Sequence, residues 1–169
     1  MVSLREGFTT GTAAAAATKA AVIALVCGRI LSSVEVNLPN EARLSIPIAR
    51  VENEGGQMRA VVMKDGGDDP DVTHGSEIHS LVRLDPLLQQ SEIAIEGGPG
   101  VGKVTMPGLP VPQGEWAINP VPREQILKAA RQALLEGPKQ TQGLFISIQV
   151  PDGERMAQHT MNPRLGIKG

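Results

Sequence analysis

The residues best suited to chemistry lie in one acidic stretch, Lys64-Asp65-Gly66-Gly67-Asp68-Asp69-Pro70-Asp71-Val72-Thr73-His74-Gly75. Residues 59–63 before it predict a short strand, and the two glycines end that strand because glycine tolerates positive φ. Carboxylates this close together repel one another unless a cation offsets them, and the histidine titrates near neutral pH. A solvated acidic turn without a further role is the alternative interpretation.

We take these carboxylates and the histidine as candidates for stabilising positive charge or accepting a proton. The candidate catalytic residues are Asp65, Asp68, Asp69 and His74. A calcium site with Asp65, Asp68, Asp69 and Asp71 as oxygen ligands is the metal alternative, but the spacing differs from that of the known calcium-binding loop. We therefore predict no metal.

A second candidate is the start of an alanine-rich run at 13–27, which predicts a helix because alanine is the best helix former. Gly28 is placed to end this helix in a left-handed cap, and Thr12 is a suitable N-cap. Only one threonine and one lysine interrupt the run, so most of the helix circumference should be buried. With Thr9 and Thr10, the helix start offers hydroxyls and free N–H groups to an anion, and simple capping is the alternative.

A third candidate is the glycine turn Gly97-Gly98-Pro99-Gly100-Val101-Gly102-Lys103-Val104, which follows a short predicted strand at 93–95. Its spacing matches a phosphate-binding P-loop, but valine replaces the magnesium-binding hydroxyl and the prolines of 107–112 prevent the helix that must follow. We therefore reject a P-loop. Gly98, Gly100 and Gly102 can instead give a ligand close access to the backbone beside Lys103, and a plain glycine-rich hairpin is the alternative.

The surrounding pattern predicts an α+β fold. Strands are predicted at 33–38 and 43–48, which form a hairpin, and at 57–63, 77–84, 93–95 and 144–150, the last of them central; helices are predicted at 13–27, near 123–136 and at 154–161. A mixed sheet of about five to seven strands should be packed by the alanine-rich helix and the helix near 123–136. Pro47 predicts an edge position, and His79 is predicted to be a surface residue.

Composition narrows the function classes. Aromatic residues make up 2% of the 169 residues and the net charge is −2, which argues against nucleic-acid binding. The single cysteine excludes an internal disulfide and a thiolate zinc site. The apolar run at 13–27 is shorter than the ~20 residues that span a bilayer, and its lysine argues against a secretory signal, so we expect a cytoplasmic protein without a membrane partner. The length predicts one domain at 1–150, with 151–169 beginning a connection.

Several stretches resemble signatures of the cobalt-precorrin-5B methyltransferases, the D-type proteins of anaerobic cobalamin biosynthesis. They are the acidic stretch, the run from Gly7 through the alanines, the glycine turn, Gly114-Glu-Trp-Ala-Ile-Asn-Pro-Val-Pro-Arg123, and Asn162-Pro-Arg-Leu-Gly-Ile167. Two positions depart from the family pattern: Ala13 stands where the family often has cysteine, and Trp116 where it usually has proline.

The resemblance implies methyl transfer from S-adenosylmethionine, the co-substrate, to a ring carbon of a cobalt corrinoid, converting cobalt-precorrin-5B to cobalt-precorrin-6A. Such an enzyme mainly holds donor and acceptor in line. Because the substrate rim carries acetate and propionate groups, basic and hydroxyl side chains should bind it. The expected substrate-binding residues are Thr9, Thr10, Thr12, Lys64, Lys103 and Arg123, and Gly98, Gly100 and Gly102 would serve the cofactor.

The resemblance covers nearly all of this sequence but only about the first half of a typical member. We therefore also consider a non-catalytic corrinoid-binding module, or one half of a split enzyme that needs a partner. A homo-oligomer and a complementing C-terminal half are the protein partners considered. In every case we expect the glycine- and proline-rich bends to lie around one pocket.

Overall fold

The computed structural model describes residues 7–65, 75–153 and 167–168. In chain order its elements are α1 (Thr10–Cys27), β1 (Ser33–Asn37), β2 (Arg43–Pro47), β3 (Arg50–Glu54), β4 (Gln57–Met63), β5 (Glu77–Asp85), β6 (Ile93–Gly97), β7 (Lys103–Val104), α2 (Pro120–Leu134), β8 (Gly143–Gln149) and β9 (Ile167–Lys168). The acidic residues at 68, 69 and 71, His74 and the helix predicted at 154–161 lie outside the described residues.

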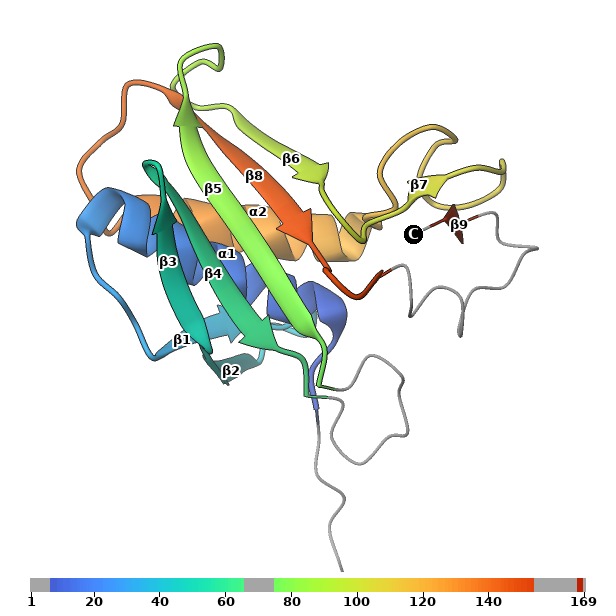
Figure 1. The fold of residues 1–169 in the computed structure, drawn as a ribbon, viewed down its shortest axis with the longest axis horizontal. Coiled ribbons are helices and arrows are strands. Elements are labelled where there is room, and N and C mark those ends of the chain that lie inside the picture. Colours follow the sequence, from blue (N-terminus) through green and yellow to red (C-terminus); the bar gives the residue numbers. More distant parts are fainter. Residues whose placement is uncertain (1–6, 66–74, 154–166, 169) are drawn as a thin grey trace, which may run out of the picture.

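The main sheet has five strands in the order β3-β4-β5-β8-β6 (Figure 1). Neighbours are antiparallel except β6 and β8, which are parallel and are connected through α2. This mixed sheet confirms the predicted α+β class, and β8 is an interior strand as predicted. The edge strand β3 was not predicted, because its sequence Arg-Val-Glu-Asn-Glu lacks apolar alternation and only its pairing with β4 through Gly55-Gly56 makes it a strand.

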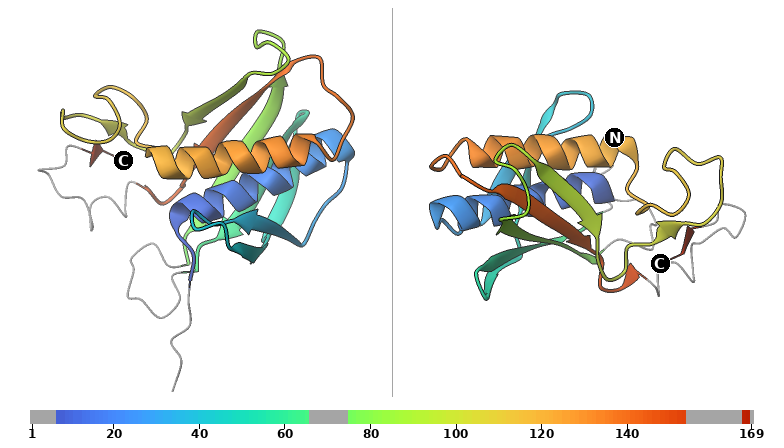
Figure 2. Two further views of the ribbon diagram at one scale, coloured as in Figure 1. Left: turned by 180° about the vertical axis from the view of Figure 1, so that it is seen from behind. Right: turned by 90° about the horizontal axis from the view of Figure 1, so that it is seen from above.

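Both helices cover the same face of the main sheet (Figure 2). Helix α1 is buried from Gly11 to Ala24 with the exception of Lys19, which confirms the prediction from the alanine-rich run. By length and hydropathy alone α1 could cross a membrane, but 67% of that window is buried inside the molecule. Small alanine side chains allow it to lie close to β4 and β5 on one side and to α2 on the other.

Helices α1 and α2 run parallel, as three contacts along their length show. Thr12 bonds to Gln125 near their starts, Lys19 to Gln132 midway, and Arg29 to Glu136 past their ends. The helices therefore begin side by side at one end of the molecule and finish side by side at the other. We call these the loop end and the far end.

The hairpin of β1 and β2 forms a separate sheet that packs on α1. Val34, Val36 and Ile46 of this hairpin are buried in the same core as the helix. The Lys19 ammonium donates to the Glu35 carbonyl at 2.7 Å, which ties the hairpin to the helix. Both strands lie at an edge, as Pro47 predicted.

Two predicted helix starts need correction. Helix α1 begins at Thr10 rather than at residue 13, and its N-cap is Thr9 rather than Thr12, because the Thr9 hydroxyl accepts from the Thr12 N–H. Helix α2 begins at Pro120, before the predicted Arg123, because proline fits the first helical turn. The glycine turn is followed by strand β7, which agrees with the rejection of a P-loop.

Candidate functional site

The loop end collects the termini of several elements. Strand pairing places the end of β8 beside the start of β5, with Gln149 opposite His79, and beside the end of β6, with Ile148 opposite Gly97. The end of β4 lies there too, because Met63 pairs with Glu77. The starts of both helices, the base of the acidic stretch and the glycine turn therefore share one end of the sheet (Figure 1).

The two helix starts are joined by a buried hydrogen bond. The Gln125 amide donates to the Thr12 hydroxyl at 2.9 Å, and the Thr9 hydroxyl donates to the same oxygen at 3.1 Å. Gly11 allows this close approach, since a Cβ there would lie 2.9 Å from the Pro122 Cβ. Two helix starts side by side present the positive ends of two dipoles to the same region.

Of the three predicted threonines, the structure leaves two open at the surface. Thr9 and Thr10 are exposed, whereas Thr12 is 1% exposed and its hydroxyl contacts Gln125 and Thr9. Thr12 therefore holds the helix starts together, and its predicted contact with substrate stays a prediction. Sequence analysis did not select Gln125 as a site residue. Its position on the buried side of a predicted helix was the feature that could have indicated it.

The base of the acidic stretch is closed by backbone hydrogen bonds. The Lys64 N–H donates to the Ser76 carbonyl at 2.8 Å, and the Gly75 N–H donates to the Lys64 carbonyl at 2.7 Å. The Phe8 N–H donates to the Asp65 carbonyl at 2.8 Å, which fastens the approach to α1 to this base. Lys64 is 5% exposed and Asp65 is half-buried, so Asp65 is the more open of the two to a ligand.

A hollow of about 380 Å³ lies at this base. It is lined by Phe8, Pro47, Ala49, Met63, Lys64, Asp65 and Gly75. Its walls are mostly apolar, with one ammonium and one carboxylate, which is the composition of a small-molecule site. Of the predicted site residues, Lys64 and Asp65 line this hollow, whereas Lys103 and Arg123 do not. Within the described residues, the hollow is therefore not the single pocket expected to be shared by all the loops.

Packing accounts for two of the three predicted cofactor glycines. A Cβ at Gly98 would lie 2.7 Å from the Ser147 hydroxyl, and a Cβ at Gly100 would overlap the Val150 carbonyl oxygen. Gly100 also has φ of +82°, which other residues rarely adopt. The turn is thus pressed against the end of β8, and its glycines are needed there with or without a ligand.

Lys103 and Arg123 are two further basic groups of the loop end. The Lys103 ammonium lies 4.6 Å from the centre of the Trp116 ring, a cation–π contact. Trp116 also packs on Gly97, where a Cβ would overlap its ring, so Trp116 is a packing residue of the turn. Arg123 is half-buried in the first turn of α2, and within the described part of the chain its guanidinium has no ion-pair partner.

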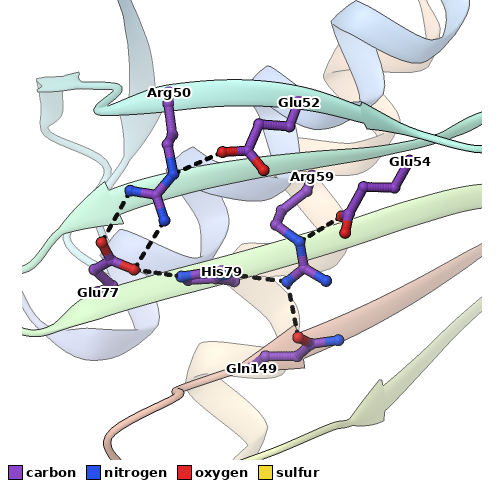
Figure 3. A network of polar contacts seen from close by, with 7 residues as sticks. All are labelled: Arg50, Glu52, Glu54, Arg59, Glu77, His79 and Gln149. Atoms are coloured by element: carbon purple, nitrogen blue, oxygen red, sulfur yellow. Dashed lines mark hydrogen bonds and ion pairs between the residues drawn. The ribbon is translucent and has the colours of Figure 1, made fainter.

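Sequence analysis missed a polar network on the sheet face away from the helices (Figure 3). His79, predicted to be a surface residue, is 6% exposed, because register places it between β4 and β8 side chains. Its Nδ1 lies 3.0 Å from Arg59 Nη1 and its Nε2 lies 2.8 Å from Glu77. Since a guanidinium can only donate, His79 Nδ1 accepts from Arg59 and Nε2 donates to Glu77.

The network extends from the acidic stretch to the glycine turn. Arg50 forms a two-point pair with Glu77 at 2.9 and 3.0 Å, and Arg59 donates to Gln149 at 2.8 Å. Hydrogen bonds from Arg50 first, and then from His79, lower the pKa of Glu77 to about 2. The same pair raises the pKa of Arg50.

The ends of this network touch both candidate loops. Glu77 follows two residues after Gly75, and the Gln149 side chain lies where a Cβ at Gly98 would meet it, at 2.7 Å. The residues of this network come together only through the register of the strands. The one feature visible in the sequence was that Glu77 and His79, two residues apart in a predicted strand, must lie on the same face. Among the described residues, no cluster of three or more His, Cys, Asp or Glu side chains could hold a metal ion.

Comparison with known proteins points to one family. The CbiD family model matches residues 1–169. The chain is 48% identical over 167 residues to the cobalt-precorrin-5B C(1)-methyltransferase of Geobacillus kaustophilus, covering 99% of this chain and 44% of that protein. It is 49% identical over 165 residues to that of Thermus thermophilus, covering 98% of this chain and 42% of that protein.

A solved structure agrees. The crystal structure of the cobalamin biosynthesis protein CbiD from Archaeoglobus fulgidus matches with a TM-score of 0.71 and 35% identity, over 98% of this chain and 50% of that one. The chain thus spans less than half the length of these curated relatives. Because the family model extends over the whole sequence, this chain belongs to the CbiD family.

Proposed function

We propose that this chain forms the N-terminal, substrate-binding part of a cytoplasmic methyltransferase that uses S-adenosylmethionine to methylate cobalt-precorrin-5B at a ring carbon, giving cobalt-precorrin-6A. The names of the relatives support the reaction. The observation that carries the assignment within this chain is the loop end, where two helix starts, the base of the acidic stretch and the glycine turn lie together.

The substrate is a flat polyanion, and the loop end is suited to its carboxylates. Two parallel helix starts favour negative charge, and the exposed hydroxyls of Thr9 and Thr10 stand at one of them. Arg123 in the first turn of the other helix and Lys103 beside the glycine turn add positive charge. Lys64 keeps its proposed role, although its burial leaves little of it open to substrate.

The hollow beside Asp65 is suited to the methyl donor. Its volume of about 380 Å³ is in the range of small-molecule sites. The Phe8 and Met63 side chains would exclude water, and a carboxylate beside a sulfonium cation stabilises it. Asp68, Asp69 and His74 follow Asp65 in the sequence and complete the proposed catalytic group, and Gly98, Gly100 and Gly102 keep their proposed role beside the cofactor.

Calorimetric titration of the purified chain tests the substrate half of this proposal. Cobalt-precorrin-5B should bind, and Lys103→Glu or Arg123→Glu should each weaken binding by about tenfold or more, because a charge reversal removes one attraction and adds one repulsion. Lys128→Glu is the matched control, since it reverses an exposed charge further along α2 and should leave affinity unchanged. Equal affinity for all variants would refute the assignment of the loop end.

A second titration separates the proposed reaction from the alternative. If S-adenosylmethionine also binds and Asp65→Asn weakens it, the hollow holds the donor as proposed. If the corrinoid binds and S-adenosylmethionine does not, the chain is a corrinoid-binding module that needs its complementing half. Mass spectrometry of the corrinoid after incubation with both ligands then shows directly whether a methyl group has been transferred.

A further inference from the structure

One arginine on the sheet face away from the helices binds side chains from three other strands (Figure 3). Arg59 of β4 pairs with Glu54 of β3. It also donates to His79 Nδ1 of β5 at 3.0 Å and to Gln149 Oε1 of β8 at 2.8 Å. The Arg59 side chain is 17% exposed. Because a guanidinium is a rigid planar group with several donors, it can fix the relative positions of the groups that it binds.

One branch from this arginine reaches the glycine turn. The Gln149 amide donates to the Ser147 hydroxyl at 3.2 Å. A Cβ at Gly98 would lie 2.7 Å from both the Gln149 Cγ and the Ser147 Oγ, so the backbone of the turn rests directly on these two side chains. The Gly98 N–H donates to the Ile148 carbonyl at 2.8 Å, which holds the turn in this position. A movement of Gln149 must therefore be felt at Gly98.

The other branch reaches the base of the acidic stretch. His79 Nε2 donates to the Glu77 carboxylate at 2.8 Å, and Arg50 holds the same carboxylate at two points. Glu77 directly follows Ser76, whose carbonyl accepts from the Lys64 N–H at 2.8 Å. An unbroken chain of side-chain contacts thus joins the base of the acidic stretch to the glycine turn.

Stability alone is a weak explanation for this chain of contacts. Taking a guanidinium largely out of water costs free energy that its polar partners do little more than offset, and apolar side chains of similar volume often give equal or greater stability. Such a network can instead specify geometry. A second arginine on the same face differs in this respect: Arg83 lies over the Phe145 ring at 4.2 Å and pairs with Asp85, at the end of β5 away from both loops.

We propose that Arg59 is a positioning residue that holds the glycine turn and the base of the acidic stretch at a fixed separation, acting through Gln149 on one side and His79 on the other. Breaking the chain of contacts at one end should therefore loosen the loop at the other end. For the substrate, this inference rests on the proposed function: a macrocycle whose carboxylates reach both loops binds more tightly when their spacing is set beforehand.

Amide hydrogen exchange in the chain without ligands tests the coupling. Glu77→Met removes the carboxylate that accepts from His79. The Gly98 N–H at the other end should then exchange about fivefold faster relative to the Ala20 N–H, which is buried in α1. The ratio to Ala20 removes a change that is only a loss of global stability. An unchanged ratio would overturn the proposal.

Glu52→Gln is the matched control for a carboxylate lost from this face. Glu52 pairs with Arg50 at 2.8 Å but lies outside the chain of contacts, so Glu52→Gln should leave the ratio of Gly98 to Ala20 exchange as it is in the wild type. A change as large as that produced by Glu77→Met would show a general effect of charge on the sheet face and would contradict the proposal.

Two variants of equal length at Gln149 test the route. Gln149→Glu keeps an oxygen that accepts from Arg59, whereas Gln149→Met removes it. Because Gln149 itself touches Gly98, the quantity to compare is the further change caused by Glu77→Met in each background. That change should persist with Gln149→Glu and disappear with Gln149→Met. An equal change in both backgrounds would show that the coupling does not pass through Arg59 and Gln149.

Calorimetric titration with cobalt-precorrin-5B tests the consequence for the site. Arg59→Met should weaken binding by about fivefold or more, because the two loops would no longer be held at one spacing. Arg83→Met is the control, since it removes the same charge from the same face and should leave the affinity unchanged. Equal affinity in both variants would overturn the positioning role. If the wild-type chain binds no corrinoid, the proposed function fails, whereas hydrogen exchange still decides whether the loops are coupled.

Discussion

The two helices begin side by side at one end of the molecule and finish side by side at the other, yet the two ends are held in different ways. At the loop end the tie is a buried bond from Gln125 to Thr12, with Gly11 fitted against Pro122. At the far end the tie is an exposed pair between Arg29 and Glu136. The polar contact between the helices is therefore buried at one end and shared with solvent at the other.

The surfaces of the loop end and the far end also differ in how much apolar area they expose. Among the described residues of the loop end, Gly97, Gly98 and Gly100 are tightly packed, and the exposed large apolar side chains are less exposed than those of the far end. The far end leaves Leu87 and Leu135 almost fully exposed, and Leu135 lines a hollow there. Preorganised polar ends suit small ligands, and uncovered apolar surface suits a protein partner. The predictions below test this contrast, from the largest effect to the smallest.

The largest effect is expected at Gly100. Gly100→Ala should lower the free energy of unfolding by about 3 kcal/mol, because its Cβ would overlap the Val150 carbonyl oxygen and its φ of +82° disfavours alanine. Gly114→Ala is the control, with φ of +90° and open space around it, and should cost about 1 kcal/mol. Urea unfolding measures both, and equal costs would show that the turn is not pressed against β8.

Next is the buried tie between the helix starts. Thr12→Val keeps the shape but leaves the Gln125 amide without its acceptor, so stability should fall by about 2 kcal/mol. The double variant Thr12→Val with Gln125→Leu should recover part of this loss, since neither polar group then remains. Thermal unfolding of Thr12→Val, Gln125→Leu and the double variant measures these losses. A double variant whose loss of stability equals the sum of the two single losses would contradict this prediction.

An acid titration tests the network that joins the two candidate loops. Since the pKa of Glu77 is lowered from 4.5 to about 2, its contribution is present above pH 4.5 and is lost as the pH falls toward 2. The loss should be on the order of 1 kcal/mol after allowance for solvent screening. Glu77→Gln or Arg50→Met should flatten this acid branch of the stability curve, and an unchanged slope in both would show that the pair adds nothing.

The smallest effect is expected at the far end. Arg29→Met removes the pair with Glu136, whose side chains are 53% and 46% exposed, and should cost about 0.5 kcal/mol or less. High salt should reduce even this difference, because exposed charges are screened. Urea unfolding at low and high salt measures it. A loss as large as that of Thr12→Val would remove the contrast between the two ends.

Local sequence patterns were sufficient for most of the elements. Helix α1, the β1–β2 hairpin and strands β4, β5, β6 and β8 follow from alternation, helix propensity and turn residues within a few positions. Strand β3 did not, because a charged edge strand has no pattern of its own and forms only against β4. The motifs also indicated the family, since long ordered stretches of sequence are specific where composition is not.

The candidate site was determined in a different way. The residue types at Thr9, Asp65, Lys103 and the glycines could be chosen from the sequence, because loops with special backbone geometry and charge are visible there. The arrangement of these residues in space could not be predicted from the sequence, because strand order and register decide which loops meet. That is why His79, placed at the surface by its local pattern, lies buried between Arg59 and Glu77. The sequence determined which groups are present, and the pairing of distant strands decided which of them touch.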